Sequence, residues 1–276
     1  MSLRGWTPDF LQASPLFAPL CPAASGLEHL HNWPDIGALE HLRDNATAPP
    51  VTRCGKPVHF VPQDVAAREF AQQYEPRIYL AGEVQTRVHN WHDLFNALVW
   101  LTFPRAKAAL NQLHYQALLQ EHGNEKVQRG PLRDTATLFD ESGVIVASSD
   151  AGSSKLLQNY EWKQLFWRRR KAVCAHMRFF LFGHGLYEKA LKPYTGMTGK
   201  GIILAVEQDF FHRPLPVQLA VADSMLDNFL SSGVVAPVVL SPVPLLGYPG
   251  WSPDNAAEAY YDNSNYFRPR PMRIAD

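Results

Sequence analysis

The spacing of apolar residues predicts a chain built mainly from helices. Residues 92–114 repeat apolar side chains at helical intervals, and Pro104 interrupts the repeat. Because a proline inside a helix removes a hydrogen bond and clashes with the preceding turn, we expect one helix to end near Thr102 and another to begin at Pro104. The same periodicity predicts further helices at residues 36–42, 63–73, 156–182, 184–191 and 217–230.

Short strands are predicted between these helices. Residues 77–88 predict a hairpin because two strand-like runs flank a polar turn, and residues 135–148 predict a second hairpin with its turn at residues 140–143. A further strand is predicted at residues 201–206. Several prolines follow Ser231, so this apolar segment is expected to pack on the core as extended chain.

The order of the elements predicts an α+β fold. Helices and hairpins follow one another without βαβ alternation, which indicates a mainly helical domain with short antiparallel hairpins and a proline-rich extended C-terminal segment. No linker or low-complexity tract divides the chain. We therefore expect residues 1–62 to form an N-terminal arm packed on the core, and residues 63–276 to form a single α+β domain.

Composition and charge narrow the class of protein. The 276 residues are 46% apolar and carry 26 basic and 26 acidic side chains, so binding to nucleic acid or an acidic membrane would need local charge segregation. The three cysteines form no CxxC pair, which fits a reducing compartment. No apolar run has the length of a signal peptide or membrane span. We expect a cytoplasmic protein without a membrane partner, and its oligomeric state stays open.

The first candidate site lies at the start of the helix predicted from residue 92. His92 and Asn96 are four residues apart, and Asp93 and Asn96 are three apart, so an imidazole, a carboxylate and an amide share one helical face. Such a set can hold a metal ion or a substrate. Alternatively, Asp93 caps the helix and the set is a buried hydrogen-bond cluster.

The second candidate site is the pair His184 and Glu188. These residues are also four apart, and an imidazole with a carboxylate on one helical face makes half of a zinc, iron or manganese site. Gly183 and Gly185 flank the histidine and permit a close backbone approach or the start of a helix. The alternative is a His–Glu pair that only fixes a turn.

The third candidate group surrounds the second predicted hairpin. Arg133 and Asp134 precede its first strand, and Asp140 and Glu141 occupy its turn, so hairpin closure would bring the carboxylates close to Arg133. Turn chemistry alone also explains Asp140, because short acidic side chains bond to the turn backbone.

Charge is segregated along the second half of the chain. Residues 155–200 hold ten basic and two acidic side chains, and residues 201–267 hold seven acidic and one basic. Arg168, Arg169 and Arg170 lie beside aromatic residues, a combination that binds phosphates and stacks on bases. Because they span a whole helical turn, they can instead pair with the acidic C-terminal third.

Four segments carry a resemblance to a known family. They are TRVHNWHDLFNALVWLTFPRAKAALN (86–111), RDTATLFDESGVIVAS (133–148), FGHGLYEKAL (182–191) and GYPGWSPDN with YYDNSNYFRPR (247–270). Over residues 70–270 the chain resembles a bacterial domain-of-unknown-function family, number three thousand and twenty-five in that series. The resemblance implies no established activity. It does favour a shared site, and shared packing of the same segments is the alternative. The residues of that site would be His92, Asp93, Asn96, Arg133, Asp134, Asp140, Glu141, His184 and Glu188.

A second resemblance concerns topology alone. The predicted hairpin at residues 77–88, followed by a helix that opens with HDLFN, is similar to the ββα-metal finger of HNH-type nucleases. That finger holds one divalent ion with a hairpin and a helix. The general-base histidine that such nucleases place near the end of the first strand is replaced here by residues 77–80, so His89 or His92 would have to serve instead.

These features lead to two hypotheses on function. The first is a metal-dependent hydrolase for a phosphodiester or nucleotide, in which a zinc, manganese, iron or magnesium ion lowers the pKa of a bound water. The assigned residues are His92, Asp93, His184 and Glu188 for the ion, Asp140 or Glu141 as proton acceptor, Arg133 or Lys189 for charge stabilisation, and Asn96, Asp134, Arg168, Arg169 and Arg170 for the substrate. The second is a non-catalytic module that binds RNA, a nucleotide or a protein through the basic aromatic helix.

Overall fold

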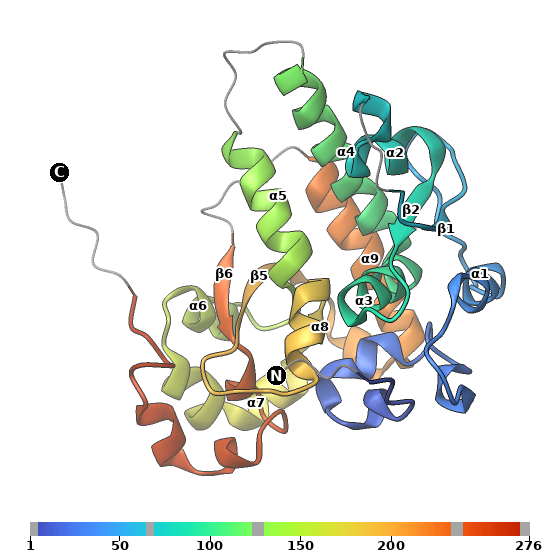
Figure 1. The fold of residues 1–276 in the computed structure, drawn as a ribbon. Helices are drawn as coiled ribbons and strands as arrows, with labels where there is room; N and C mark the ends of the chain where they lie inside the picture. The colour runs from blue at the N-terminus through green and yellow to red at the C-terminus, as the bar shows by residue number, and fades with distance from the viewer. Residues whose placement is uncertain (1–4, 65–68, 123–129, 233–239, 271–276) are drawn as a thin grey trace.

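A four-stranded sheet forms the middle of the structure, a computed structural model that describes residues 5–64, 69–122, 130–232 and 240–270 (Figure 1). Its strand order is β4–β3–β5–β6. The strands are β3 (Gly143–Ser148), β4 (Met177–Leu181), β5 (Thr198–Ala205) and β6 (Ser241–Pro244). β3 pairs parallel with β5 and antiparallel with β4, while β5 and β6 are antiparallel. All of β3 is buried, as expected for a central strand that is covered on both faces.

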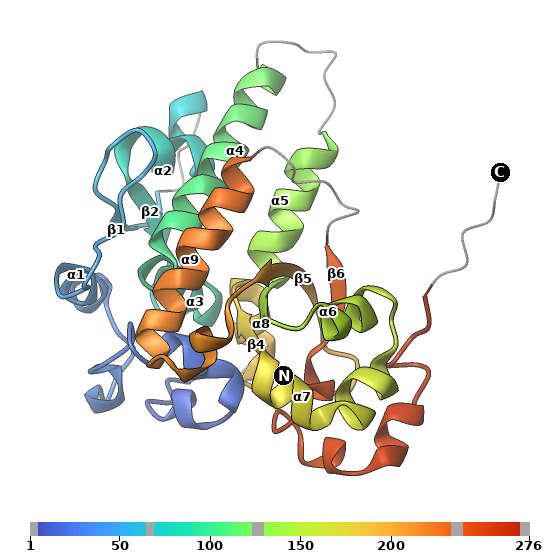
Figure 2. The ribbon, with the colours of Figure 1, turned by 180° about the vertical axis from the view of Figure 1, so that it is seen from behind.

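Four long helices and the short α8 pack beside this sheet and carry most of the polar cavity described below. They are α3 (Trp91–Thr102), α4 (Pro104–His122), α5 (Pro131–Ser142), α8 (His184–Ala190) and α9 (Leu215–Ser231). α4 contacts both α9 and α5, and these helices run side by side (Figure 2). α8 contacts α3 and α5. Three of the segments that hold candidate site residues are therefore neighbours in space.

The remaining elements are short. The helices are α1 (Ile36–Asp44), α2 (Tyr74–Ala81), α6 (Ala151–Gln158) and α7 (Arg170–His176), and the strands β1 (His59–Pro62) and β2 (Glu83–Thr86) form a second, parallel sheet. A π-helical turn covers Gln164–Arg168. Turns of 3-10 helix cover Phe10–Gln12, Pro15–Leu20, Leu27–His29, Phe70–Gln72, Gln208–His212, Leu245–Gly247, Pro253–Ala256 and Glu258–Asp262. No described helix combines the length and apolarity needed to cross a bilayer.

The N-terminal residues contribute to the same core as the helices. Phe17 is fully buried, and its ring lies 5.7 Å from that of Phe95 on α3 and 6.0 Å from that of Tyr187 on α8. Residues 59–62 form β1, which pairs with β2 beyond the expected boundary. The division of the chain into an arm and a domain at residue 62 stays a prediction.

The α+β class is confirmed, together with several of its elements. α1, α8, β5 and α9 lie where the sequence predicts them, and the chain breaks between Thr102 and Pro104 as expected. No α-helix forms within residues 240–270. Part of the helix predicted at residues 63–73 lies outside the described residues, and the rest holds a single 3-10 turn.

The hairpin predicted at residues 135–148 is wrong. Helix α5 runs to Ser142, and β3 begins directly after it. Pro131 at the first helical position and Asp134 in the first turn favour a helix start. Burial of Ala136 and Phe139, three residues apart, then places one helical face on the core. Tertiary packing thus outweighs the local turn signal.

The hairpin predicted at residues 77–88 is also wrong. Residues 77–80 belong to α2, which ends at Gly82 in the left-handed region with φ 77°. A Cβ there would lie 2.0 Å from the carbonyl oxygen of Pro57, so the position requires glycine. β2 pairs with β1, not with residues 77–80. The ββα arrangement of the nuclease finger is therefore absent from this described segment.

The long helix predicted at residues 156–182 is interrupted. α6 ends at Gln158, a π-helical turn and α7 follow, and Met177–Leu181 is the edge strand β4. This apolar run pairs with β3, whose residues lie 29 to 37 positions earlier, from Ser148↔Met177 to Val144↔Leu181. A partner so distant in sequence leaves no mark on local periodicity.

Gly183 joins β4 to α8 at a point where a larger residue cannot fit. A Cβ on Gly183 would lie 2.4 Å from the backbone nitrogen of Gly143 and 2.5 Å from that of Ser142. We predict that Gly183→Ala lowers the free energy of unfolding by about 1–3 kcal/mol, as overpacking against fixed backbone does. Urea unfolding measures the change. Gly5→Ala is the control because its Cβ would meet no atom within 4 Å. Equal midpoints for both variants would contradict the account.

Candidate metal centre

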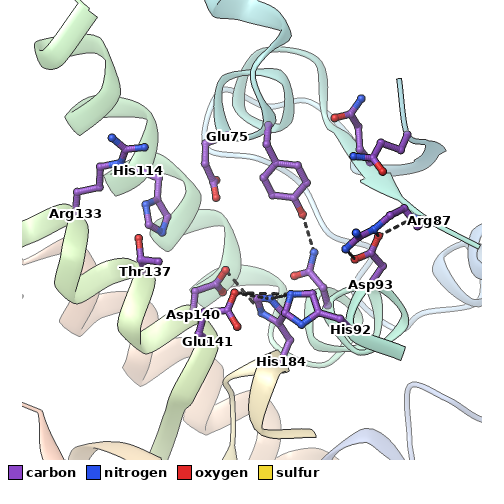
Figure 3. A pocket seen from close by; sticks show the side chains of 14 residues that line it. Glu75, Arg87, His92, Asp93, His114, Arg133, Thr137, Asp140, Glu141 and His184 are labelled. Carbon is purple, nitrogen blue, oxygen red and sulfur yellow. Dashed lines mark hydrogen bonds and ion pairs between the residues drawn. The ribbon is translucent and has the colours of Figure 1, made fainter. Parts of the chain in front are cut away.

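A polar cavity of about 420 Å³ lies between α2, α3, α4, α5 and α8 (Figure 3). Its lining residues are Gln63, Tyr74, Glu75, Gln85, Arg87, His92, Asp93, Asn96, His114, Arg133, Thr137, Asp140, Glu141 and His184. This volume suits one small molecule. Seven of the residues that the sequence singles out lie in this single lining: His92, Asp93, Asn96, Arg133, Asp140, Glu141 and His184.

Three side chains from three helices meet at one end of the cavity. His92 lies in the first turn of α3, Glu141 in the last turn of α5, and His184 is the first residue of α8. The two Nε2 atoms are 3.0 Å apart, and Oε1 of Glu141 lies 3.3 Å from Nε2 of His184 and 3.7 Å from Nε2 of His92. Their donor atoms all lie within 4.8 Å of one another, close enough to share one metal ion.

A carboxylate faces the other nitrogen of each histidine. Nδ1 of His92 lies 3.2 Å from Oε2 of Glu188, and Nδ1 of His184 lies 3.8 Å from Oδ2 of Asp140. The hydrogen bond to Glu188 favours the His92 tautomer with its proton on Nδ1, which leaves the Nε2 lone pair free. The distance of 3.8 Å is too long for a hydrogen bond, so Asp140 favours a proton on Nδ1 of His184 through its charge alone. Two such lone pairs at 3.0 Å repel each other unless a cation or proton lies between them. Carboxylate–histidine pairs of this kind accompany protein metal sites.

Asp140 is held in its ionised form by a buried lysine. Nζ of Lys107 donates to Oδ1 of Asp140 at 2.5 Å and to Oδ1 of Asn96 at 3.0 Å. Burial raises the pKa of Asp140, but the charges of Lys107 and His184 and the lysine hydrogen bond outweigh burial and lower the pKa to about 2. Asp140 is therefore a weak proton acceptor, and its position suits it to orient His184.

Glu141 is also stabilised as a carboxylate. Its hydrogen bond with His184 lowers its pKa, and this effect together with the charges of both histidines exceeds the opposing effect of burial. An ionised carboxylate beside two imidazole nitrogens is the donor set of many catalytic zinc sites. Glu141 is thus one of three side chains that could hold a metal ion, whereas the sequence assigns it to proton transfer.

Asp93 faces away from this group and binds Arg87. It accepts hydrogen bonds from the backbone nitrogen of Arg87 at 2.7 Å and from its Nε and Nη2 atoms, both at 2.9 Å. Burial raises the pKa of Asp93, but these bonds outweigh burial and lower the pKa. The helix cap is Asn90, whose side chain accepts from the backbone nitrogen of Asp93 at 3.1 Å. Asp93 is neither the cap nor one of the three residues whose donor atoms converge.

Arg133 lines the cavity, and the predicted site residues not yet described lie outside its lining. Nη1 of Arg133 lies 2.5 Å from Oε2 of Glu121. Asp134 and Lys189 are exposed and do not line the cavity. Glu188 contacts His92 from outside.

The basic segment is separate from the cavity. Nη2 of Arg168 lies 2.6 Å from Oε1 of Glu258, and Nη2 of Arg169 lies 2.7 Å from Oδ2 of Asp150. Arg170 donates to the carbonyl of Asn255 at 2.8 Å. The pairing of Arg168 with Glu258 agrees with the interpretation in which these arginines bind the acidic C-terminal third.

A polar stripe on α4 was missed by the sequence analysis. Lys107, Asn111 and His114 are spaced by four and three residues, so they share one helical face, and each is at most 5% exposed. The stripe is visible in the sequence as polar residues at helical spacing inside an alanine- and leucine-rich helix. It was not predicted because only the apolar positions of this segment were used to predict the helix.

Comparison with known protein families identifies one family for this chain. Residues 58–271 match the family described as "Protein of unknown function (DUF3025)", and the chain belongs to this family. The match covers all the residues of the cavity lining. No curated protein matches the chain, and neither does any solved structure.

The ion pair of Lys107 and Asp140 gives a test of how the site is held. Lys107→Met leaves a buried carboxylate without its cation, so we predict that the free energy of unfolding falls by about 3–5 kcal/mol at pH 7. Urea unfolding measures this loss. The additional change Asp140→Asn should restore part of it. Arg213→Met is the control, because Arg213 pairs with Asp209 at the surface, where water and salt screen the pair and its loss should change stability little. A loss for Lys107→Met no larger than the control loss would refute the account.

Proposed function

We propose that the protein is a metal-dependent hydrolase whose ion is bound by His92, Glu141 and His184. The observation that carries the proposal is the convergence of the three donor atoms within 4.8 Å at the wall of a cavity. Relative to the sequence hypothesis, Glu141 replaces Asp93 and Glu188 as a ligand. Three protein ligands facing a cavity leave a position open for water or substrate, as in catalytic metal sites.

Zinc, iron or manganese suits this donor set best. Imidazole nitrogen is a ligand for zinc and iron, whereas magnesium prefers an octahedral shell of oxygen atoms. An ion bound here would lower the pKa of a coordinated water and polarise the scissile group of the substrate.

The residues around the three ligands have distinct roles in the proposed reaction. Asp140 and Glu188 orient the imidazoles of His184 and His92. Tyr74 accepts a hydrogen bond from the amide of Asn96 at 2.7 Å. The Tyr74 residue is 39% exposed overall, but its hydroxyl is bonded to the buried amide of Asn96. Burial of this hydroxyl, together with nearby carboxylates, raises the pKa of Tyr74 well above its usual value, so the hydroxyl keeps a proton that it can donate to a substrate oxygen.

Two earlier expectations stay predictions. A phosphodiester or nucleotide substrate would meet Arg87 and Arg133, the arginines of the described lining, and each of these already binds a carboxylate.

The non-catalytic alternative, binding of RNA, a nucleotide or a protein, would use the hollow at residues 167–172. The carboxylates paired with Arg168 and Arg169 reduce the positive field there. The cytoplasmic location is likewise a prediction.

Metal content tests the proposal directly. Protein purified without chelator or nickel resin is predicted to hold about one zinc, iron or manganese ion per chain by elemental analysis. His92→Ala, Glu141→Ala and His184→Ala should each lose it because each removes one of three ligands. Lys189→Ala is the control because Lys189 is exposed and outside the lining. A wild-type protein that holds no metal, and that binds no added zinc in calorimetry, would rule the proposal out.

The carboxylates behind the histidines give a second prediction. Glu188→Ala removes the carboxylate that lies 3.2 Å from Nδ1 of His92 and leaves the three proposed ligands unchanged. We expect zinc affinity to fall about 10–100-fold, the range found when such supporting carboxylates are lost. Competition with a chromophoric chelator measures it. Glu188→Gln keeps an acceptor for Nδ1 and should lose less. Unchanged affinity in Glu188→Ala would mean that Glu188 has no part in the centre.

A further inference from the structure

The cavity has a second polar group besides the three proposed ligands. Glu75 comes from the first turn of α2 and His114 from the polar stripe of α4, and both line the cavity. Figure 3 shows them on the wall above Asp140 and Glu141, with Arg133 and Thr137 on the same side as His114. Neither residue belongs to the group of three donors that could hold a metal.

Glu75 is held in place by a buried amide. Nδ2 of Asn111 donates to Oε2 of Glu75 at 2.7 Å and to its backbone carbonyl at 3.0 Å. Asn111 is only 3% exposed, so these bonds are shielded from water and fix the carboxylate. The carboxylate is thus positioned before any ligand arrives.

Glu75 differs from the other carboxylates of the lining in having no basic partner within the described parts of the chain. Asp93 binds Arg87, Asp140 binds Lys107, and Glu141 lies beside the two histidines. The side chain of Glu75 has only the neutral Asn111 amide as a hydrogen-bond partner there. Arg133 on the same wall is neutralised by Glu121. The wall therefore carries one uncompensated negative charge.

His114 is the independent sign that this wall binds something. It is 5% exposed, its ring lines the cavity, and no hydrogen bond joins the ring to another side chain in the described parts of the chain. A neutral imidazole has one nitrogen that donates and one that accepts, so the ring can bond to water or to a ligand that enters the cavity. Because His114 lines the cavity, that partner would occupy the cavity.

We propose that Glu75 and His114 form a subsite for a cationic amine of the substrate. The inference rests on the proposed hydrolase and narrows its substrate class to small amides or esters that bear an ammonium group. The ammonium would pair with the fixed carboxylate of Glu75 and donate to a ring nitrogen of His114, while the scissile carbonyl lies at the three ligands. A negatively charged phosphodiester would instead meet the unpaired carboxylate and be repelled.

Binding of paired hydroxamates to the zinc-loaded protein tests the subsite. A hydroxamate binds the metal, and the hydroxamates of glycine, β-alanine, 4-aminobutyrate and 6-aminohexanoate place an ammonium at increasing distance from it. Each is compared by calorimetry with the alkyl hydroxamate of equal chain length. At least one amine should bind about tenfold more tightly than its alkyl partner, as a charge-assisted hydrogen bond provides.

Substitutions of Glu75 and His114 then test whether these residues cause the difference in affinity between amine and alkyl hydroxamates. Glu75→Gln keeps an acceptor for Asn111 but removes the charge, so the amine preference should fall below about twofold while the alkyl hydroxamates bind as before. His114→Gln should weaken the preference as well. Glu161→Gln is the control, because Glu161 is an exposed carboxylate outside the lining and should leave the preference intact.

Three results would overturn the subsite while leaving the metal centre in place. These are equal affinities within every pair, an amine preference that survives Glu75→Gln, and a second zinc ion per chain that Glu75→Gln removes. Failure of the proposed function gives a different pattern: the wild-type protein would hold no zinc, and neither kind of hydroxamate would bind.

Discussion

The buried ion pair of Lys107 and Asp140 is the interaction on which the rest of the site depends. Their side chains are 6% and 15% exposed, so each charge relies on the other. The pair joins α4 to α5, and it reaches Asn96 on α3 through Lys107 and His184 on α8 through Asp140. Four helices therefore meet at one lysine and one carboxylate. This constraint brings the ends of α3, α5 and α8 together, and the three donor atoms with them.

Charge compensation around this pair decides what the cavity can bind. Every described cation of the lining already has a carboxylate, so the cavity offers little to an anion beyond the metal itself. The surplus is negative: Glu141 lies beside the two histidines and suits a divalent ion, and Glu75 lines the cavity with only a neutral amide as its partner among the described residues. The two proposals share this basis, because each identifies a place where negative charge or lone pairs lack a partner.

The sequence predicts those elements that local chemistry determines. It fails for the elements that depend on contacts between residues distant in the sequence. The break at Pro104 follows from proline geometry alone, and the spacing of His184 and Glu188 correctly places them on one short helix. The hairpin predicted at residues 135–148 was wrong because burial of a helical face on the core outweighed a turn-like DESG segment. Helical spacing also cannot show that His92 and His184 meet, because their contact joins residues 92 positions apart.

The central claim is that His92, Glu141 and His184 bind one metal ion. X-ray absorption spectroscopy at the zinc edge of the zinc-loaded protein tests it most directly. The account predicts two imidazole nitrogens and oxygen ligands at about 2.0–2.1 Å, with the imidazole scattering reduced in His184→Ala. The three cysteines are free and exposed, so zinc bound through their sulfur atoms is the alternative to zinc bound by the histidines. Sulfur scattering at about 2.3 Å, or a spectrum without imidazole, would contradict the claim.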